Sequence, residues 1–242
     1  MINAFIIGAM KCGTNTLYHA LRQDPRIAVP ERKELDYFLK TNNPSSYDSC
    51  FDMTSDTQVL LDGTTQYSKY PGMKHVPQAI HRMNRDAKIV FLLRDPIDRL
   101  ESNMAHNIAR RWKIGIDDWF GSDVWRQACK FNCYFQVASM YARLFGADNL
   151  YLGIFEKMVE NPSKFAMDVA RFIGVDAEIS VPATFQKNKR RSDNQADQLS
   201  LAHFHEMDAI QYFKEDLDCL KQVFNVDYDP YWKRYREALE SA

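Results

Sequence analysis

The chain has 242 residues, of which 45% are hydrophobic, and its 31 basic and 32 acidic residues leave a formal net charge of −1. This apolar content supports a sizeable core and excludes a disordered chain. The even charge balance argues against non-specific nucleic-acid binding, which a basic excess would favour. The length suits one large α/β domain, and we predict a single domain over residues 1–242.

The cysteine pattern and the hydropathy bear on the compartment. There are five cysteines, Cys12, Cys50, Cys129, Cys133 and Cys219. Their odd number and the lack of a CxxC pair disfavour a zinc site or a disulfide framework, so we predict a reducing compartment. No window of about 18 apolar residues occurs. The sequence therefore predicts a cytoplasmic protein with no membrane segment.

Four short apolar runs are typical of strands buried on both faces. They are Ala4–Ile7, Val59–Leu61, Lys88–Leu93 and Leu150–Ile154. Helical patterns separate these runs along the chain. This alternation predicts an α/β fold, with a central parallel sheet flanked by helices.

Apolar stripes at helical spacing predict five of the helices. In chain order they cover 14–23, a helix opened by Asp95-Pro96, residues 131–145 closed by Gly146, a helix from Asn161-Pro162 to Gly174, and the stripe Phe213, Leu217, Leu220, Phe224. Cys129 and Cys133 lie four residues apart in the sequence and are predicted to share one helix. Residues 40–57 and 186–198 are polar and are predicted to be surface loops.

The first strand runs into a glycine-bearing turn and then into a helix. The turn spans Gly8 to Gly13, and Thr14-Asn15-Thr16 opens the helix. Backbone amides at a helix N-terminus, together with the helix dipole, bind anions. In the nucleotide P-loop a lysine follows the second glycine, but here Lys11 lies inside the loop. This P-loop-like turn therefore indicates a phosphate that carries a transferable group.

A second anion site follows the 88–93 strand. That strand ends in Arg94, and Ser102 lies eight residues further along the predicted helix. A hydrolytic P-loop enzyme has at this point an acid that holds Mg²⁺, whereas a guanidinium is a good phosphate ligand. Two anion sites without such an acid suit a nucleotide phosphorylated at two places. Alternatively, Arg94 pairs with a helix carboxylate.

The residues around these two sites resemble a known family. FIIGAMKCGTNTL (5–17) and FLLRDPIDRLESN (91–103) resemble the 5′-phosphosulfate and 3′-phosphate motifs of sulfotransferases that use 3′-phosphoadenosine-5′-phosphosulfate (PAPS). RKELDYF (32–38) and LDGTTQYSKYP (61–71) are similar to segments of the heparan sulfate N- and 3-O-sulfotransferase group. The resemblance covers nearly the whole chain.

The resemblance implies a sulfotransferase fold, metal-independent transfer from PAPS, adenosine 3′,5′-bisphosphate as product, and roles for individual residues. Lys11 and Glu34 would be catalytic, with Glu34 as the general base. Asp62 would lie with Glu34 on the acceptor side. Donor binding would use the loop and helix residues, the second anion site and a basic loop: Lys11, Cys12, Gly13, Thr14, Asn15, Thr16, Arg94, Ser102, Lys189, Arg190 and Arg191.

Several points stay open at this level. Gly63 and Thr65 replace a lysine and a proline of the 3-O-type motif, which weakens the case for a polysaccharide contact. The acceptor can be a glycan or a small molecule, and its reacting group a hydroxyl or an amine. The region from Trp112 to Trp125 either stacks on sugars or fills core. Two alternative hypotheses for the function are a kinase-like phosphotransferase acting on a small molecule and a non-catalytic nucleotide-binding protein. The oligomeric state is not predicted.

Overall fold

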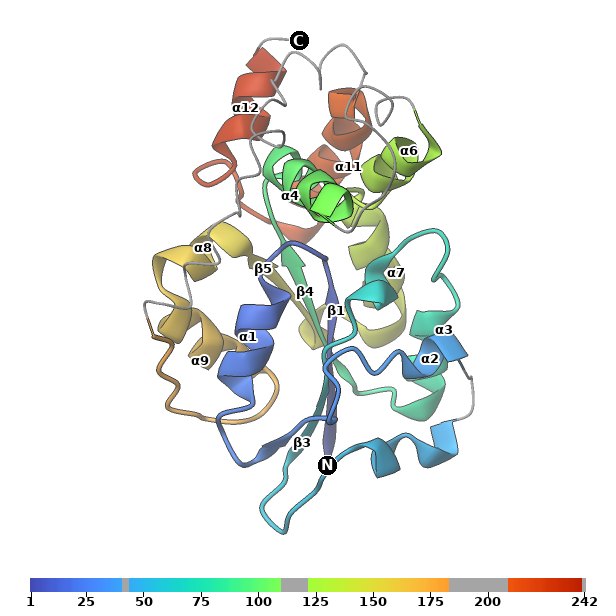
Figure 1. The fold of residues 1–242 in the computed structure, drawn as a ribbon, viewed down its shortest axis with the longest axis vertical. Helices are drawn as coiled ribbons and strands as arrows, with labels where there is room; N and C mark the ends of the chain where they lie inside the picture. Colours follow the sequence, from blue (N-terminus) through green and yellow to red (C-terminus); the bar gives the residue numbers. More distant parts are fainter. Residues whose placement is uncertain (41–43, 110–121, 183–208, 241–242) are drawn as a thin grey trace. The chain divides into compact units, whose positions relative to one another are not determined.

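A computed structural model describes residues 1–40, 44–109, 122–182 and 209–240 (Figure 1). The contacts group the chain into two compact units. The sheet unit comprises residues 1–93 and 137–185, and the helical unit comprises residues 94–136 and 186–242. The single domain over residues 1–242 stays a prediction.

The sheet unit contains five parallel strands in the order β2-β3-β1-β4-β5. They are β1 (Ile2–Gly8), β2 (Ile27–Ala28), β3 (Val59–Asp62), β4 (Lys88–Leu93) and β5 (Leu150–Ile154). β1 is central, because Ala4 lies opposite Leu61 of β3 and opposite Lys88 of β4. The predicted α/β fold with a central parallel sheet is confirmed, although β2 was not predicted.

Helices cover both faces of this sheet (Figure 1). One face carries α1 (Thr14–Leu21), α8 (Phe155–Glu160) and α9 (Pro162–Phe172), and the other carries α2 (Tyr37–Lys40), α3 (Val76–Met83) and α7 (Tyr134–Phe145). Short 3₁₀ turns are η1 (Pro44–Ser46), η2 (Asp48–Cys50), η3 (Thr65–Ser68) and η4 (Ala147–Asn149). The strand interiors are therefore closed to water on both sides, as their continuous apolar runs require.

The helical unit contains α4 (Pro96–Ala109), α6 (Asp123–Lys130), α11 (Ala209–Phe224) and α12 (Lys233–Glu240). The predicted cap of α4 is confirmed, because a carboxylate oxygen of Asp95 accepts a hydrogen bond of 2.9 Å from the Ile97 amide. The apolar stripe of α11 forms core, with Phe213, Leu217 and Leu220 fully buried. The C-terminal helix α12 was not predicted.

The helix predicted over 131–145 is confirmed as α7, although it begins at Tyr134 rather than at Phe131. A break separates it from α6, which ends at Lys130. The break centres on Asn132, whose buried side chain donates to the Ala128 carbonyl at 3.1 Å and accepts from Arg99 at 2.7 Å. Cys129 therefore lies in α6 and Cys133 lies outside it, so the two do not share a helix.

The predicted surface loop over 40–57 also needs correction. Its Tyr47 is completely buried and stacks on Phe38, with 5.3 Å between the ring centroids. These two rings belong to a larger aromatic cluster in the sheet unit, which comprises Phe5, Tyr37, Phe38, Tyr47, Phe51 and Tyr67. The sequence did not indicate that Tyr47 is buried, because its neighbours are polar and the segment has no regular spacing of apolar residues.

Candidate functional site

The loop after β1 is shaped by its second glycine. Gly13 is the residue before α1 and has a φ of 78°, in the left-handed region that favours glycine. A Cβ at this position would lie 2.2 Å from Met158 and 2.8 Å from Phe155 of α8. The loop is also tied to the sheet, because the Ala9 amide donates to the Leu92 carbonyl at 2.9 Å. Both contacts fix the start of α1.

The first turn of α1 presents backbone donors. In the described part of the chain, the amides of Thr14, Asn15 and Thr16 have no hydrogen-bond acceptor, and no side chain caps the helix. Lys11 is half-buried within the loop, and Cys12 is buried with its amide bonded to the Ala9 carbonyl at 3.2 Å. Open amides at the positive end of a helix dipole, with a lysine beside them, make a site for a phosphate-like anion.

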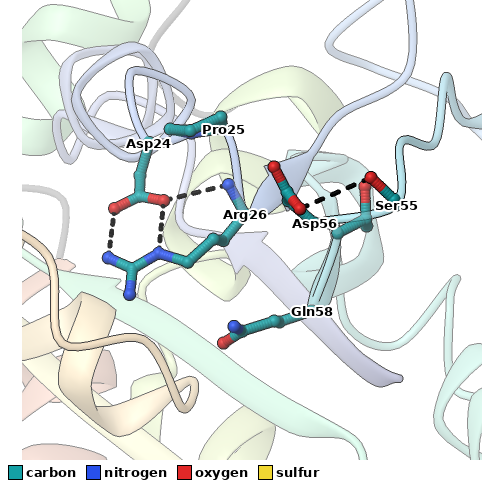
Figure 2. A pocket seen from close by; sticks show the side chains of 7 residues that line it. Asp24, Pro25, Arg26, Ser55, Asp56 and Gln58 are labelled. Carbon is teal, nitrogen blue, oxygen red and sulfur yellow. Dashed lines mark hydrogen bonds and ion pairs between the residues drawn. The ribbon is translucent and has the colours of Figure 1, made fainter.

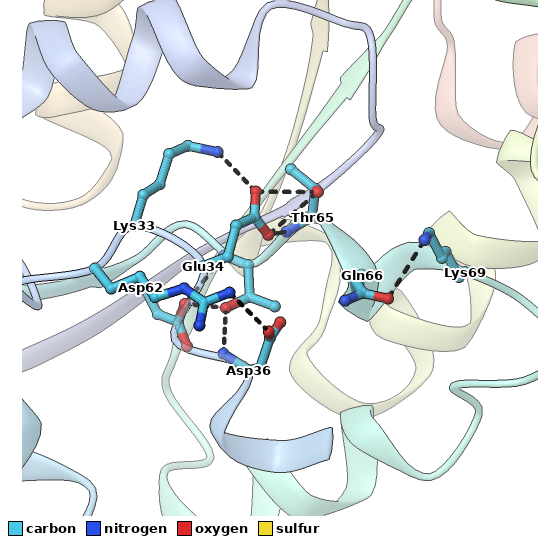
Figure 3. Close-up of polar contacts among 9 residues, drawn as sticks. Lys33, Glu34, Asp36, Asp62, Thr65, Gln66 and Lys69 are labelled. Carbon is cyan, nitrogen blue, oxygen red and sulfur yellow. Dashed lines mark hydrogen bonds and ion pairs between the residues drawn. The ribbon is translucent and has the colours of Figure 1, made fainter. Parts of the chain in front are cut away.

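Glu34 is held by hydrogen bonds from Thr65 and Lys33 (Figure 3). Its Oε2 accepts from the Thr65 amide at 2.7 Å, and its Oε1 accepts from Lys33 Nζ at 3.0 Å. The Thr65 hydroxyl lies 3.2 Å and 3.3 Å from the two carboxylate oxygens. The Glu34 side chain remains 33% exposed. The carboxylate is therefore fixed in orientation yet open to a reactant.

The segment Gly63–Ser68 contacts both Glu34 and the loop Gly8–Gly13 between β1 and α1, the phosphate loop. Besides the Thr65 contacts to Glu34, a Cβ at Gly63 would lie 2.7 Å from the Tyr18 ring of α1. At the other end, a Cβ on Gly8 would lie 2.1 Å from the Ser68 hydroxyl. Because these packed contacts all lie at the carboxyl ends of β1 and β3, they join Glu34 and the loop in one cluster within the sheet unit.

Asp62 lies beneath this segment and is fully buried. Its Oδ1 accepts from the Thr64 amide at 3.0 Å and the Thr64 hydroxyl at 2.6 Å, and its Oδ2 accepts from the Tyr67 hydroxyl at 3.1 Å. Burial raises the pKa of Asp62 to about 7, against the lowering effect of these hydrogen bonds. The Thr64 hydroxyl also accepts from the Asp36 amide at 3.1 Å. Asp62 thus organises the turn from inside the protein.

The second anion motif belongs to the helical unit. Arg94 is the residue after β4; its side chain is half-buried, and its carbonyl accepts from the Tyr134 hydroxyl at 2.9 Å. Ser102 is half-buried on α4. Lys189, Arg190 and Arg191 lie outside the described residues, as do Trp112 and Trp119, whereas Trp125 is buried in the helical unit.

Comparison with known proteins places the chain in a family. The family model for the sulfotransferase domain matches residues 2–227. The chain belongs to the sulfotransferase-domain family. Among curated proteins it is 24% identical over 195 residues to mouse heparan sulfate glucosamine 3-O-sulfotransferase 6 and 23% identical to the human protein of the same name. In each case the match covers 71% of this chain and 52% of the relative, so the chain spans about half the length of these relatives.

Solved structures give the same fold. A sulfotransferase from Alicyclobacillus acidocaldarius is 22% identical with a TM-score of 0.76, and the match covers 96% of this chain and 99% of that chain. The sulfotransferase domain of the Synechococcus PCC 7002 olefin synthase is 15% identical with a TM-score of 0.56, covering 94% and 95%. The resemblance seen in the sequence motifs is thereby confirmed at the level of family and fold.

Sequence reasoning missed several residues of the candidate site. Lys33, Thr64, Thr65 and Tyr67 orient the two carboxylates, and Tyr18 packs against Gly63. A partial signal was present, because an aspartate side chain in a turn often accepts a hydrogen bond from the backbone two residues further along the chain. The Lys33 contact had no such signal, since neighbouring charged residues usually point into solvent.

A pocket of about 570 Å³ lies elsewhere on the sheet unit (Figure 2). It is lined by residues 24–26 and 55–58, which precede β2 and β3. Arg26 is held there by both carboxylate oxygens of Asp24 and by the Asp176 carbonyl at 2.9 Å. This pocket is at the amino ends of the strands, whereas ligands of open α/β sheets bind at the carboxyl ends. It does not belong to the candidate site.

Among the residues that the structure describes, no group of three or more histidine, cysteine, aspartate or glutamate side chains could hold a metal ion. None of the described helices combines the length and the apolar character needed to cross a membrane.

Proposed function

We propose that this domain transfers a sulfuryl group from PAPS to a hydroxyl or amine of an acceptor and releases adenosine 3′,5′-bisphosphate. The family membership supports the reaction class. The observation that carries the proposal is that Glu34 and the phosphate loop pack against the same short segment, Gly63–Ser68. A base for the acceptor and a cradle for the donor are thus joined at one edge of the sheet.

On the donor side, the proposal assigns the 5′-phosphate to Lys11 and to the first-turn amides of α1 at Thr14, Asn15 and Thr16. Lys11 carries a positive charge at the point where negative charge develops on the bridging oxygen as the sulfur–oxygen bond breaks. Gly13 gives the backbone its left-handed turn, and buried Cys12 supports the loop. Arg94 and Ser102 are assigned to the 3′-phosphate, where a guanidinium can bind with two parallel hydrogen bonds.

On the acceptor side, Glu34 acts as the general base. As the acceptor oxygen or nitrogen bonds to sulfur, its proton passes to the Glu34 carboxylate, and the electron pair of the broken bond goes to the leaving phosphate. Lys33 and Thr65 hold the carboxylate in place, so little reorganisation is needed at the moment of transfer. A positioned base of this kind contributes about 10²- to 10⁴-fold in rate.

Asp62 enters this proposal as a positioning residue. With no exposed surface and both oxygens bonded to Thr64 and Tyr67, its carboxylate supports the turn that carries Thr65. Direct contact between Asp62 and an acceptor is therefore not part of the proposal.

The experiment is an assay of adenosine 3′,5′-bisphosphate release by mass spectrometry, with PAPS and pooled acceptors. Glycans head the panel, because the curated relatives are named for heparan sulfate glucosamine; phenols and small alcohols follow. We expect Lys11→Ala and Glu34→Gln each to lose most turnover with the fold intact, and Arg94→Ala mainly to weaken PAPS binding. Exposed Lys74→Ala and Glu31→Gln are the matched controls.

Each of the following outcomes would refute a different part of the proposal. Near-normal turnover of Glu34→Gln at saturating PAPS would remove Glu34 as the base. No uptake of adenosine 3′,5′-bisphosphate in calorimetry would remove the donor. Magnesium-dependent ATP turnover would favour a kinase, and PAPS binding without consumption by any acceptor would favour a non-catalytic protein. Turnover that is lost in EDTA would contradict the metal-independent mechanism.

A further inference from the structure

The turn that carries Arg94 is packed against the C-terminal segment Tyr228–Glu240, which lies beyond the family match at residues 2–227. The link is Asp95, which is 2% exposed. One of its carboxylate oxygens caps α4 through the Ile97 amide at 2.9 Å. The other accepts from the Tyr235 amide, in the first turn of α12, at 3.0 Å. A single carboxylate therefore caps two helices at once.

Ion pairs reinforce this junction. Arg234 of α12 lies 3.1 Å from an Asp98 oxygen and 2.5 Å from a Glu101 oxygen, both on α4. The Glu101 side chain is only 9% exposed, so water screens this pair weakly. The first turn of α12 is thereby fixed against the first two turns of α4, which are the turns between Arg94 and Ser102.

A second set of contacts reaches the Arg94 backbone itself. The Tyr134 hydroxyl donates to the Arg94 carbonyl at 2.9 Å. The Tyr134 ring packs on Trp232, which is fully buried and stacked on Tyr228 at 4.3 Å between centroids. The C-terminal segment thus reaches the Arg94–Asp95 turn in two ways. It contacts Asp95 directly through the Tyr235 amide. It also packs on Tyr134, whose hydroxyl donates to the Arg94 carbonyl.

We propose that the C-terminal segment Tyr228–Glu240 positions Arg94 for the 3′-phosphate of the donor, with Asp95 and Tyr134 as the positioning residues. This inference rests on the proposed function, in which Arg94 binds that phosphate. Neither residue touches the nucleotide; each fixes the backbone from which the guanidinium extends. Loss of either link lets the Arg94 turn move, while the phosphate loop of the sheet unit is left unchanged.

The test compares two nucleotides in calorimetry, adenosine 3′,5′-bisphosphate and adenosine 5′-phosphate, which lacks the 3′-phosphate. Arg94→Ala defines the loss expected when the 3′-phosphate contact is absent. Asp95→Asn keeps the size of the side chain and one oxygen for Ile97 but turns an amide donor toward the Tyr235 amide. Tyr134→Phe removes only the hydroxyl. Exposed Asp218→Asn is the control in the same unit.

We expect Asp95→Asn to reduce the preference for the bisphosphate by about tenfold, the size of one hydrogen bond to a charged group. Tyr134→Phe should reduce it in the same direction. Binding of the 5′-phosphate should stay within about twofold of wild type, since only the 3′-phosphate site is disturbed. Arg94→Ala combined with Asp95→Asn should lose no more preference than Arg94→Ala alone, because both changes act on one contact.

Failure of this inference is separable from failure of the proposed function. If the wild-type protein shows no preference for the bisphosphate, the proposed function fails. If Arg94→Ala abolishes the preference but Asp95→Asn and Tyr134→Phe retain it, the positioning role is wrong and the proposed function stands. Equal loss of both nucleotides in a folded variant also contradicts positioning. If Asp95→Asn does not fold, the result for Tyr134→Phe decides.

Discussion

Replacing Asp62 with asparagine changes one atom in a fully buried turn, and its effect on stability depends on pH. Burial raises the pKa of Asp62 from its ordinary 3.8 to about 7. The native protein therefore keeps this proton at pH values where the unfolded chain has released it. The free energy of unfolding contributed by Asp62 is then largest below its unfolded pKa and is lost as the pH rises through about 7.

The size of the effect follows from the pKa difference. A difference of about three pH units corresponds to about 4 kcal/mol. Asparagine keeps an oxygen that can accept from Thr64 and supplies an amide that can donate to the Tyr67 hydroxyl, so the turn is preserved. We expect the stability of wild type relative to Asp62→Asn to fall by about 4 kcal/mol between about pH 4 and about pH 8.

The measurement is urea unfolding followed by far-UV circular dichroism at intervals across this range, with linear extrapolation to water. Asp95 and Asp216, whose pKa values burial also raises to about 6, contribute the same trend to both proteins and cancel in the difference. Parallel stability curves for the two proteins would refute the reasoning. They would mean that the donors from Thr64 and Tyr67 outweigh burial and keep Asp62 ionised.

Two further predictions concern packing around the candidate site. Gly63→Ala should lower the free energy of unfolding by about 1–3 kcal/mol, because its Cβ would lie 2.7 Å from the Tyr18 ring. Gly72→Ala should change it little, because its Cβ would lie 3.7 Å from the Lys69 carbonyl oxygen, an ordinary contact. Equal effects of the two variants in thermal unfolding would contradict this. Tyr47→Phe should raise stability by about 1 kcal/mol, since its buried hydroxyl has no hydrogen-bond partner among the described residues, and Tyr67→Phe should lower it because the bond to Asp62 is lost. Destabilisation by both phenylalanine variants in urea unfolding would show that the Tyr47 hydroxyl is satisfied.

Local patterns in the sequence were enough to predict the fold class and much of the candidate site. Four of the five strands were predicted, because a strand buried on both faces is a continuous apolar run. β2, at Ile27–Ala28, is only two residues long and carries no pattern. The phosphate loop was predicted for a related reason, since a strand, two glycines and the start of a helix follow one another without interruption. These features depend on neighbours in the chain.

Contacts between distant residues decided the rest. The break between α6 and α7 depends on a hydrogen bond between Asn132 and Arg99, and the orientation of Glu34 depends on Thr65, 31 residues away. No local period encodes such partners, because each residue type is equally compatible with a solvated surface. The sequence by itself therefore determined the elements and the chemical groups at the strand ends. The tertiary structure alone decided that Asp62 supports its turn from inside while Glu34 stays open, since burial depends on what packs above each side chain.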